Sequence, residues 1–289
     1  MDSPPRDRAG QVFKPVLITR NDLISHGFTV QRIRRSLRSG ALVRLRRDRY
    51  MRQGAPDAVA AAGSIGARVT CLTLLQMLGI FVLSAKEWHF EVTRNSSRFA
   101  LPPKEKVHLH WAASSEQRFL HVTGLHAAIR HAVRCQQPRA ALATLDSLLH
   151  HGLVTREQLA ALFAELPRRF QALLMLADGS AASGPETFVR LMLRALGVSY
   201  ETQVHLAGVG YVDFVVEGWL IIECDSKEFH EGWEKQMEDR RRDLAAARLG
   251  YVTVRPLATD ILHDFTAVQR ELAAIIAALG TRYAPRPRR

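Results

Sequence analysis

The sequence lacks the features that mark secreted and membrane-spanning proteins. Residues 1–8 contain no hydrophobic segment of a signal peptide. The most apolar stretch, 72–83, is interrupted by Thr, Gln and Gly and is far shorter than the roughly 20 apolar residues that a membrane span needs. The three cysteines, Cys71, Cys135 and Cys224, lie far apart without CxxC spacing, so no disulfide framework is expected. We therefore expect a cytoplasmic protein with no membrane partner.

Acidic residues are scarce relative to basic ones. The chain has 28 Asp and Glu residues against 40 Lys and Arg residues, a formal net charge of +12 at pH 7. Residues 1–52 hold 13 of the basic and 4 of the acidic side chains, a net charge of +9, and the other residues contribute +3. Such clustering indicates a polyanionic partner, and we predict that this partner is DNA. The alternative is a solvated arginine-rich face without a partner.

The N-terminal segment has the signals of two consecutive helices. Helices are predicted over 18–27 and 29–39, because Thr19 and Thr29 are typical N-cap residues and a glycine lies at or after each end. Apolar residues at helical spacing predict that one stripe of the second helix is buried, namely Val30, Ile33 and Leu37. The side chains off this stripe that are predicted to bind DNA are Gln31, Arg32, Arg34, Arg35 and Arg38.

Two short basic strands, 41–47 and 49–51, are predicted to follow these helices. Helix, turn, helix and ribbon is the order of a winged helix-turn-helix, whose second helix enters the major groove while the ribbon contacts phosphates. The ribbon residues predicted to do so are Arg44, Arg46 and Arg47. The segment ITRNDLISHGFTVQRIRRSLRSGALVRLRRDRYM resembles the N-terminal winged-helix domain of AbiEi-type (type IV) antitoxins. The resemblance implies DNA binding, although winged helices also serve as protein-docking modules.

Residues 56–176 carry no catalytic motif and are interpreted as a mixed α/β linking domain. The predicted elements are a helix over 71–78, strands over 88–93 and 107–111, and helices over 125–134, 140–150 and 155–165. His108 and His110 would share one strand face, as metal ligands sometimes do. No third ligand is evident near them in the sequence, so we interpret them as surface or half-buried histidines.

Acidic residues interrupt two otherwise apolar segments, which lie on either side of the glycine in 217–219. A carboxylate in a buried strand is unfavourable unless it is paired, hydrogen-bonded or bound to a metal. A two-residue turn would mix the acidic and apolar faces of the hairpin. A three-residue loop, 217–219, instead pairs Asp213 with Glu223 and Phe214 with Ile222, so both faces become consistent. We therefore predict this loop, with its glycine at positive φ.

The acidic face of this hairpin is a candidate metal site. Asp213, Glu223 and Asp225 offer hard oxygen ligands suited to Mg²⁺ or Mn²⁺, which could polarise a phosphate and lower the pKa of an attacking water. Lys227 would share this face, because Glu223, Asp225 and Lys227 alternate along one strand. The residues predicted to form the opposite, core face are Val212, Phe214, Val216, Leu220, Ile222 and Cys224.

The same residues carry a second resemblance. The spacing D-x9-E-x-D resembles the PD-(D/E)XK nuclease core. The segments YVDFVVEGWLIIECDSKEFH and DRRRDLAAARLGYVTVR resemble a very-short-patch-repair-like (Vsr-like) bacterial endonuclease domain of unknown function. The resemblance implies a restriction-endonuclease-like α-β-β-β-α-β domain with Asp213 as central metal ligand and Glu223 as the second acid. It also implies that Glu186 is an accessory acid, and it places Asp225 where the wider superfamily has lysine.

The missing lysine leaves the identity of the catalytic base open. Lys227 and His230 are both candidates, because the first shares the acidic face and histidine titrates near neutral pH. On the following helix Arg240, Arg241 and Arg242 are predicted to clamp phosphates. The alternative for these arginines is a solvated face balanced by neighbouring acids.

We therefore predict an α/β (α+β overall) chain of three domains. These are a winged helix-turn-helix DNA-binding domain over 1–55, the mixed α/β linking domain over 56–176, and a Vsr-like PD-(D/E)XK nuclease-type domain over 177–289. The leading hypothesis is a DNA-binding protein with a divalent-metal-dependent endonuclease domain. The alternatives are a transcriptional regulator or antitoxin-like protein with a catalytically inactive nuclease fold, and a protein-interaction scaffold. The sequence leaves open a homodimer, a toxin or defence-system partner, and DNA versus RNA as substrate.

Overall fold

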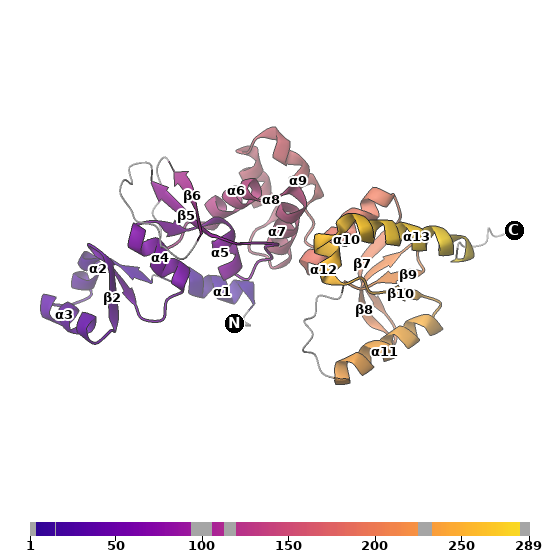
Figure 1. The fold of residues 1–289 in the computed structure, drawn as a ribbon, viewed down its shortest axis with the longest axis horizontal. Coiled ribbons are helices and arrows are strands. Elements are labelled where there is room, and N and C mark those ends of the chain that lie inside the picture. The colour runs from indigo at the N-terminus through magenta and orange to yellow at the C-terminus, as the bar shows by residue number, and fades with distance from the viewer. Residues whose placement is uncertain (1–3, 15, 94–105, 113–119, 225–232, 284–289) are drawn as a thin grey trace. The chain divides into compact units, whose positions relative to one another are not determined.

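The computed structural model describes residues 4–14, 16–93, 106–112, 120–224 and 233–283. The described residues form α-helices and three small sheets, which confirms the mixed α/β class (Figure 1). The chain divides into two compact units: residues 1–141 with 151–175, and residues 142–150 with 176–289. Within the described ranges every helix is too short or too polar to cross a lipid bilayer. The three-domain division stays a prediction.

The N-terminal part of the first unit combines short helices with an antiparallel sheet. Thr19 and Asp22 form a capping box, and the Thr29 hydroxyl accepts a hydrogen bond from the Arg32 amide at 3.2 Å, so both predicted N-caps are confirmed. The sheet has the order β1-β3-β2. The elements are α1 (Pro5–Val12), β1 (Leu17–Ile18), α2 (Arg20–Ser25), α3 (Val30–Arg38), β2 (Leu42–Arg46) and β3 (Arg49–Arg52). Neither α1 nor β1 was predicted from the sequence.

The core of this part confirms the buried stripe of α3 in part. Ile33 is buried against α2 and the sheet, and Leu37 packs against the same cluster. The placement of Val30 on the stripe was wrong, since its exposed fraction is 43%. Val30 is the first residue of α3, and Phe28, just before the N-cap, packs on the core instead.

The rest of the first unit surrounds a second small sheet, of order β4-β5-β6. Strands β5 and β6 run parallel, which aligns His89 with His108, and α5 packs against β5 and α6. The helices and strands predicted for this region are confirmed, and Thr155 and Gln158 form a capping box at the start of α8. The elements are α4 (Asp57–Ile65), β4 (Arg68–Val69), α5 (Cys71–Met77), β5 (Trp88–Thr93), β6 (Val107–Ala112), α6 (Leu125–Cys135), α7 (Pro138–His150), α8 (Arg156–Ala164), a 3₁₀ turn (Arg168–Phe170) and α9 (Gln171–Leu176).

The second unit is a four-stranded sheet with helices on both faces. The strand order is β10-β9-β8-β7, and β10 is parallel to β9 while the other pairs are antiparallel. Helix α11 covers one face, and α10 and α13 cover the other (Figure 1). The elements are residues 142–150 of α7, α10 (Gly184–Leu196), β7 (Tyr200–Leu206), β8 (Gly210–Val216), β9 (Leu220–Ile222), α11 (Trp233–Arg248), β10 (Val252–Val254), α12 (Ala258–His263) and α13 (Phe265–Tyr283).

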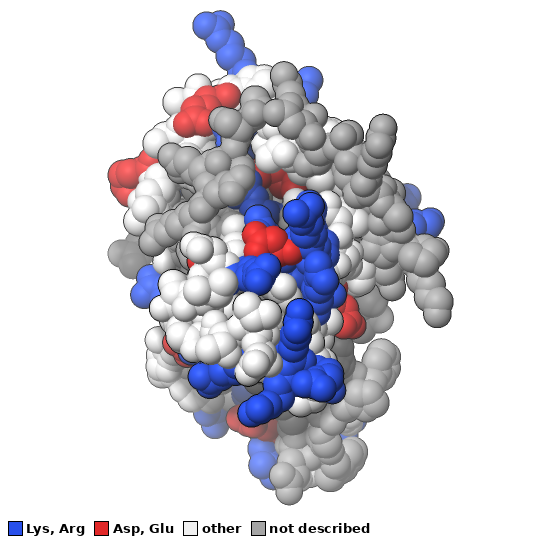
Figure 2. All heavy atoms as spheres, turned by 90° about the vertical axis from the view of Figure 1, so that its left-hand side faces the viewer, with Lys and Arg blue, Asp and Glu red and all other residues white. Residues whose placement is uncertain are grey.

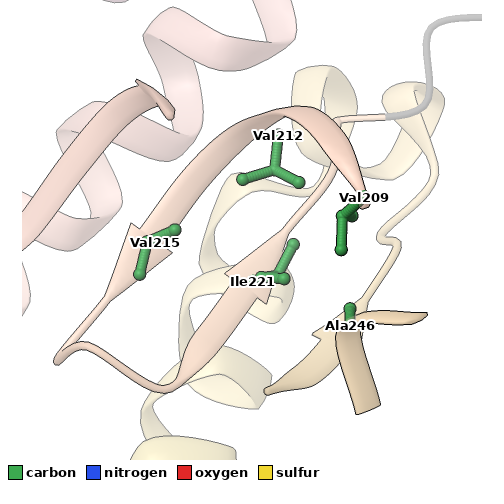
Figure 3. Packing of buried hydrophobic residues seen from close by; sticks show 5 residues of the cluster. All are labelled: Val209, Val212, Val215, Ile221 and Ala246. Atoms are coloured by element: carbon green, nitrogen blue, oxygen red, sulfur yellow. The ribbon is translucent and has the colours of Figure 1, made fainter. Parts of the chain in front are cut away.

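The β8–β9 hairpin has the predicted register. Phe214 pairs with Ile222 across a three-residue loop, in which Glu217 and Gly218 have φ angles of 50° and 73°. Each of the six predicted core residues of the hairpin is buried. The expectation of a single core face was wrong, because Val215 and Ile221 on the acidic face are also buried, against Ala246 of α11 (Figure 3). A sheet covered by helices on both faces buries both sets of side chains.

Candidate functional site

Three acidic side chains from three elements converge in the second unit. Glu186 lies in the first turn of α10, Asp213 in β8 and Glu223 directly after β9. Glu186 and Glu223 are only 5% and 8% exposed. The Asp213 amide donates to Glu223 Oε2 at 3.3 Å, and Asp213 Oδ2 accepts from the Cys224 amide at 2.7 Å. The structure therefore places Asp213 beside Glu223, as the hairpin register predicted.

Gln203 joins the three acids into one network, which we call the acidic cluster (Glu186, Gln203, Asp213 and Glu223). Its Nε2 donates to Glu186 Oε2 at 2.9 Å and lies 3.3 Å from Asp213 Oδ1. The backbone of Gln203 has φ 51°, which is uncommon for a residue other than glycine and is frequent at functional sites. Gln203 was not predicted as a site residue, because the sequence pattern of a glutamine within a strand does not indicate a site.

Burial and mutual repulsion perturb the acids of this cluster. Burial raises the pKa of Glu186 and the pKa of Glu223, and the negative charge of Asp213 raises both further. Arg242 and Arg255 oppose this rise at Glu223. Acidic groups with such perturbed pKa values are typical of sites that bind cations or transfer protons.

Arg242 points toward the acidic cluster from α11. Its guanidinium donates to Glu223 Oε1 at 3.1 Å and to the carbonyl oxygens of Val209, at 3.0 Å, and Tyr211. Helix α11 packs on the acidic face of the sheet and Arg242 lies on its inner side, so phosphate binding by Arg242 stays a prediction. Arg240 and Arg241 are exposed on α11, so phosphate binding by these two stays a prediction.

Three further predicted site residues, Asp225, Lys227 and His230, lie outside the described residues. The third metal ligand and the catalytic base therefore stay predictions from the sequence.

A different set of side chains gathers in the first unit. One ligand atom each from Cys71, His89, His110 and Cys135 lies within 4.8 Å of the other three, and all except the half-buried Cys135 are buried. We call this set the Cys₂His₂ cluster. Within the described ranges, no other three His, Cys, Asp or Glu side chains lie as close together. The three acids of the acidic cluster are therefore farther apart than the ligand atoms of the Cys₂His₂ cluster.

The interpretation of both strand histidines as surface or half-buried residues was wrong for His110, which is buried, whereas His108 is exposed. The partners of His110 lie on β5, α5 and α6, more than 20 residues away in the sequence, so they are not evident among its sequence neighbours. The sequence feature that could have indicated this cluster is the pair of cysteines, one before and one after the two strands that carry the histidines.

Two members of the Cys₂His₂ cluster, Cys135 and His110, have pKa shifts that favour the form in which they bind metal, whereas Cys71 would have to lose its proton on binding. A hydrogen bond from the Cys71 thiol, with further ones from His110 and His89, lowers the pKa of Cys135. Burial raises the pKa of Cys71. Burial also lowers the pKa of His110, which keeps its imidazole neutral at pH 7. Metal ions bind thiolates and neutral imidazoles, so this cluster could hold a metal ion.

The arginines predicted to bind DNA lie on the surface of the N-terminal part. Figure 2 views the molecule from the side of α2, α3 and β2, and Lys and Arg side chains gather near the middle of that face. All eight predicted side chains are exposed: Gln31, Arg32, Arg34, Arg35, Arg38, Arg44, Arg46 and Arg47. Exposure makes them available to a phosphate backbone.

Comparison of the chain with protein-family models gives no match, and comparison with curated proteins gives none either. The two resemblances noted in the sequence therefore stay predictions.

The pKa shift of Glu186 predicts a pH-dependent effect of Glu186→Gln on the metal-free protein. The raised pKa means that the folded state holds the proton more tightly than the unfolded state, so stability falls as pH rises from the ordinary value of 4.5 through the raised one. Glutamine does not titrate, so we expect the variant to gain stability over wild type across that window. Urea midpoints measured with chelator from acidic to neutral pH test this. Glu201→Gln, an exposed acid on β7, is the control, and an equal pH profile for both variants would contradict the prediction.

Proposed function

We propose that this protein is a DNA-binding endonuclease that uses Mg²⁺ or Mn²⁺ to hydrolyse phosphodiesters. The observation that supports it is the convergence of three carboxylates from three different elements, the buried Glu186 and Glu223 and the half-buried Asp213. Such a grouping is unfavourable without a cation, because the acids repel one another and are removed from water. A divalent ion that binds hard oxygen ligands relieves both effects.

The chemistry of the donor set fits such an ion. Asp213 and Glu223 would bind it, with Asp225 as the third ligand, and all three offer carboxylate oxygens. When bound, the ion would polarise a phosphate and lower the pKa of an attacking water. Gln203 would orient the side chains of Glu186 and Asp213, between which its amide lies. Lys227 or His230 would accept the proton of the attacking water.

The exposed arginines of α3 and of the β2–β3 ribbon would hold duplex DNA by its phosphates. This proposal rests on the net charge of +9 over residues 1–52 and on the outward position of these side chains. The order of elements in the N-terminal part supports a winged helix-turn-helix similar to that of AbiEi-type antitoxins. Arg240 and Arg241 would contact phosphates near the acidic cluster.

Replacing Arg34 and Arg38 together by glutamine should weaken DNA binding and flatten its salt dependence. Each phosphate contact contributes about 0.9 to the slope of log affinity against log salt, so the loss of two should reduce the slope by about 1.8. Fluorescence anisotropy with a duplex at several salt concentrations measures this slope. The matched control is Arg168→Gln with Arg169→Gln, two exposed arginines outside the N-terminal part. An unchanged slope would show that Arg34 and Arg38 do not contact phosphates, and a wild-type N-terminal part without salt-sensitive DNA binding would indicate a protein-docking module.

The activity itself is tested by incubating the purified chain with Mg²⁺, Mn²⁺ or chelator. The substrates are supercoiled, mismatched, nicked and single-stranded DNA, together with RNA. Cleavage that requires metal supports the proposal, and its substrate preference distinguishes DNA from RNA. Absence of cleavage with every metal and substrate would contradict it.

A DNA-binding regulator or antitoxin-like protein with an inactive nuclease fold is the second candidate. The observation that favours it is the contact of Arg242 with Glu223 Oε1 at 3.1 Å, which already compensates one carboxylate without a metal. The missing lysine after Glu223 points the same way. Salt-sensitive DNA binding without any cleavage would support this candidate.

A further inference from the structure

We propose that Cys71, His89, His110 and Cys135 form a structural zinc site in the first unit. This inference is independent of the proposed nuclease activity, since none of its residues belongs to the acidic cluster or to the arginines expected to bind DNA.

The spacing of the ligand atoms fits one tetrahedral zinc ion. Zn–N bonds of about 2.05 Å and Zn–S bonds of about 2.3 Å place tetrahedral ligands about 3.4 Å apart for two nitrogens and about 3.6 Å apart for nitrogen and sulfur. His89 Nδ1 lies 3.1 Å from His110 Nε2, and Cys135 Sγ lies 3.9 Å from the same nitrogen. All four ligand atoms lie within 4.8 Å of one another, so side-chain movements of up to about 1 Å would bring them to tetrahedral spacing around one ion.

The fold holds the first two ligands together through the junction of α5 and β5. Cys71 has φ 52° at the first position of α5, an unfavourable conformation for a residue with a Cβ atom. The Thr73 hydroxyl accepts from the His89 amide at 2.8 Å, and the Thr70 amide donates to the His89 carbonyl at 3.0 Å. These bonds fix β5 beside the start of α5, so Cys71 and His89 meet.

A second set of contacts orients His110. The His131 ring lies against the His110 ring, with 4.1 Å between ring centroids, and His131 Nε2 lies 3.2 Å from Glu91 Oε2. Glu91 in turn forms an ion pair with Arg68. An outer layer that restrains the ligand side chains is typical of metal centres.

The ligand types select zinc over the hard ions proposed for the acidic cluster. Thiolates and imidazoles bind Zn²⁺ strongly and suit Mg²⁺ and Mn²⁺ poorly. Four protein ligands leave no open position for a substrate, which is the pattern of structural sites. A surface pocket lined in part by His89, His110 and Cys135 provides a path for the ion to enter.

The test measures metal in the full-length protein purified under reducing conditions. We expect about one zinc ion per chain by elemental analysis, released when the thiols are modified, in line with a four-ligand site. Replacement of zinc by Co²⁺ should give the intense visible bands of a tetrahedral site together with a thiolate-to-cobalt charge-transfer band. A reduced protein that holds no zinc and takes up neither Zn²⁺ nor Co²⁺ would overturn the proposal, as would a cobalt spectrum without thiolate bands.

A matched pair of variants on β6 tests the ligand assignment. His110→Gln should weaken zinc binding by at least about a hundredfold, because even the loss of an outer partner typically weakens it about 10–100-fold. His108→Gln removes a neighbouring, 45% exposed histidine outside the cluster and should retain one zinc ion. Equal zinc affinity for both variants would overturn the assignment. If His110→Gln fails to fold, the wild-type cobalt spectrum and a fall in melting temperature on chelation decide the question instead.

Discussion

Asp213→Asn is expected to reduce metal-dependent cleavage by at least about a hundredfold. Loss of an outer partner of a metal ligand typically reduces activity about 10–100-fold, and loss of a direct ligand should reduce it more. Asp213 is the central acid: its charge raises the pKa of both Glu186 and Glu223, and its backbone amide and Oδ2 fix the end of the hairpin. Asparagine keeps the shape and removes the charge. Without metal the variant should fold at least as well as wild type, because the repulsion falls.

The control for this variant is Glu201→Gln, which removes one exposed charge from the same sheet and should leave cleavage unchanged. Both proteins and wild type are purified identically and assayed on the best substrate with Mg²⁺ and Mn²⁺. DNA affinity should be equal in all three. Equal cleavage by wild type and Asp213→Asn would reveal a contaminating nuclease or a different active site.

Arg190→Met is expected to destabilise the second unit by about 3–5 kcal/mol, the usual effect of removing one partner from a buried ion pair. Arg190 and Asp146 are each 1% exposed, and their closest nitrogen and oxygen are 2.6 Å apart. Arg190 also donates to the carbonyl of Leu176 at 3.0 Å, and Asp146 accepts from Thr187 and from the Asp178 amide at 2.8 and 2.7 Å. Methionine would leave the Asp146 carboxylate buried without its counter-charge.

Urea unfolding of Arg190→Met, followed by signals from the second unit, measures this loss. Burial already raises the pKa of Asp146, so without arginine the carboxyl should take up a proton more readily and the loss should be smaller at acidic pH. The control is Arg194→Met, an exposed arginine on the same helix, which should change stability by no more than about 0.5 kcal/mol. Equal stability of the two variants would show that the buried pair contributes little.

The double variant Asp146→Leu with Arg190→Met separates the contribution of the ion pair to stability from the contribution of side-chain packing. Replacement of a buried ion pair by apolar side chains is often neutral or stabilising by about 1–4 kcal/mol. The double variant should therefore be more stable than Arg190→Met alone.

Local signals were enough to predict the secondary structure around the candidate sites. Thr19 and Thr29 start their helices as expected, because an N-cap depends on a side chain and an amide within one turn. The pairing of Phe214 with Ile222 was also predictable, because it depends on residues within one hairpin. A one-residue slip would move every side chain of the strand to the other face, so the apolar pattern and the loop glycine specify the register.

The convergence of side chains from distant elements could not be predicted from the sequence, because it depends on tertiary packing, which produces no periodic pattern of residues. Gln203 enters the acidic cluster because β7 pairs with β8, and Arg242 turns inward because α11 covers the acidic face. The Cys71 and Cys135 thiols meet only when α5 and α6 pack together beside the β5–β6 pair. Residue type and spacing report contacts within one helix turn or one hairpin, whereas these contacts are set by how whole elements fit against each other.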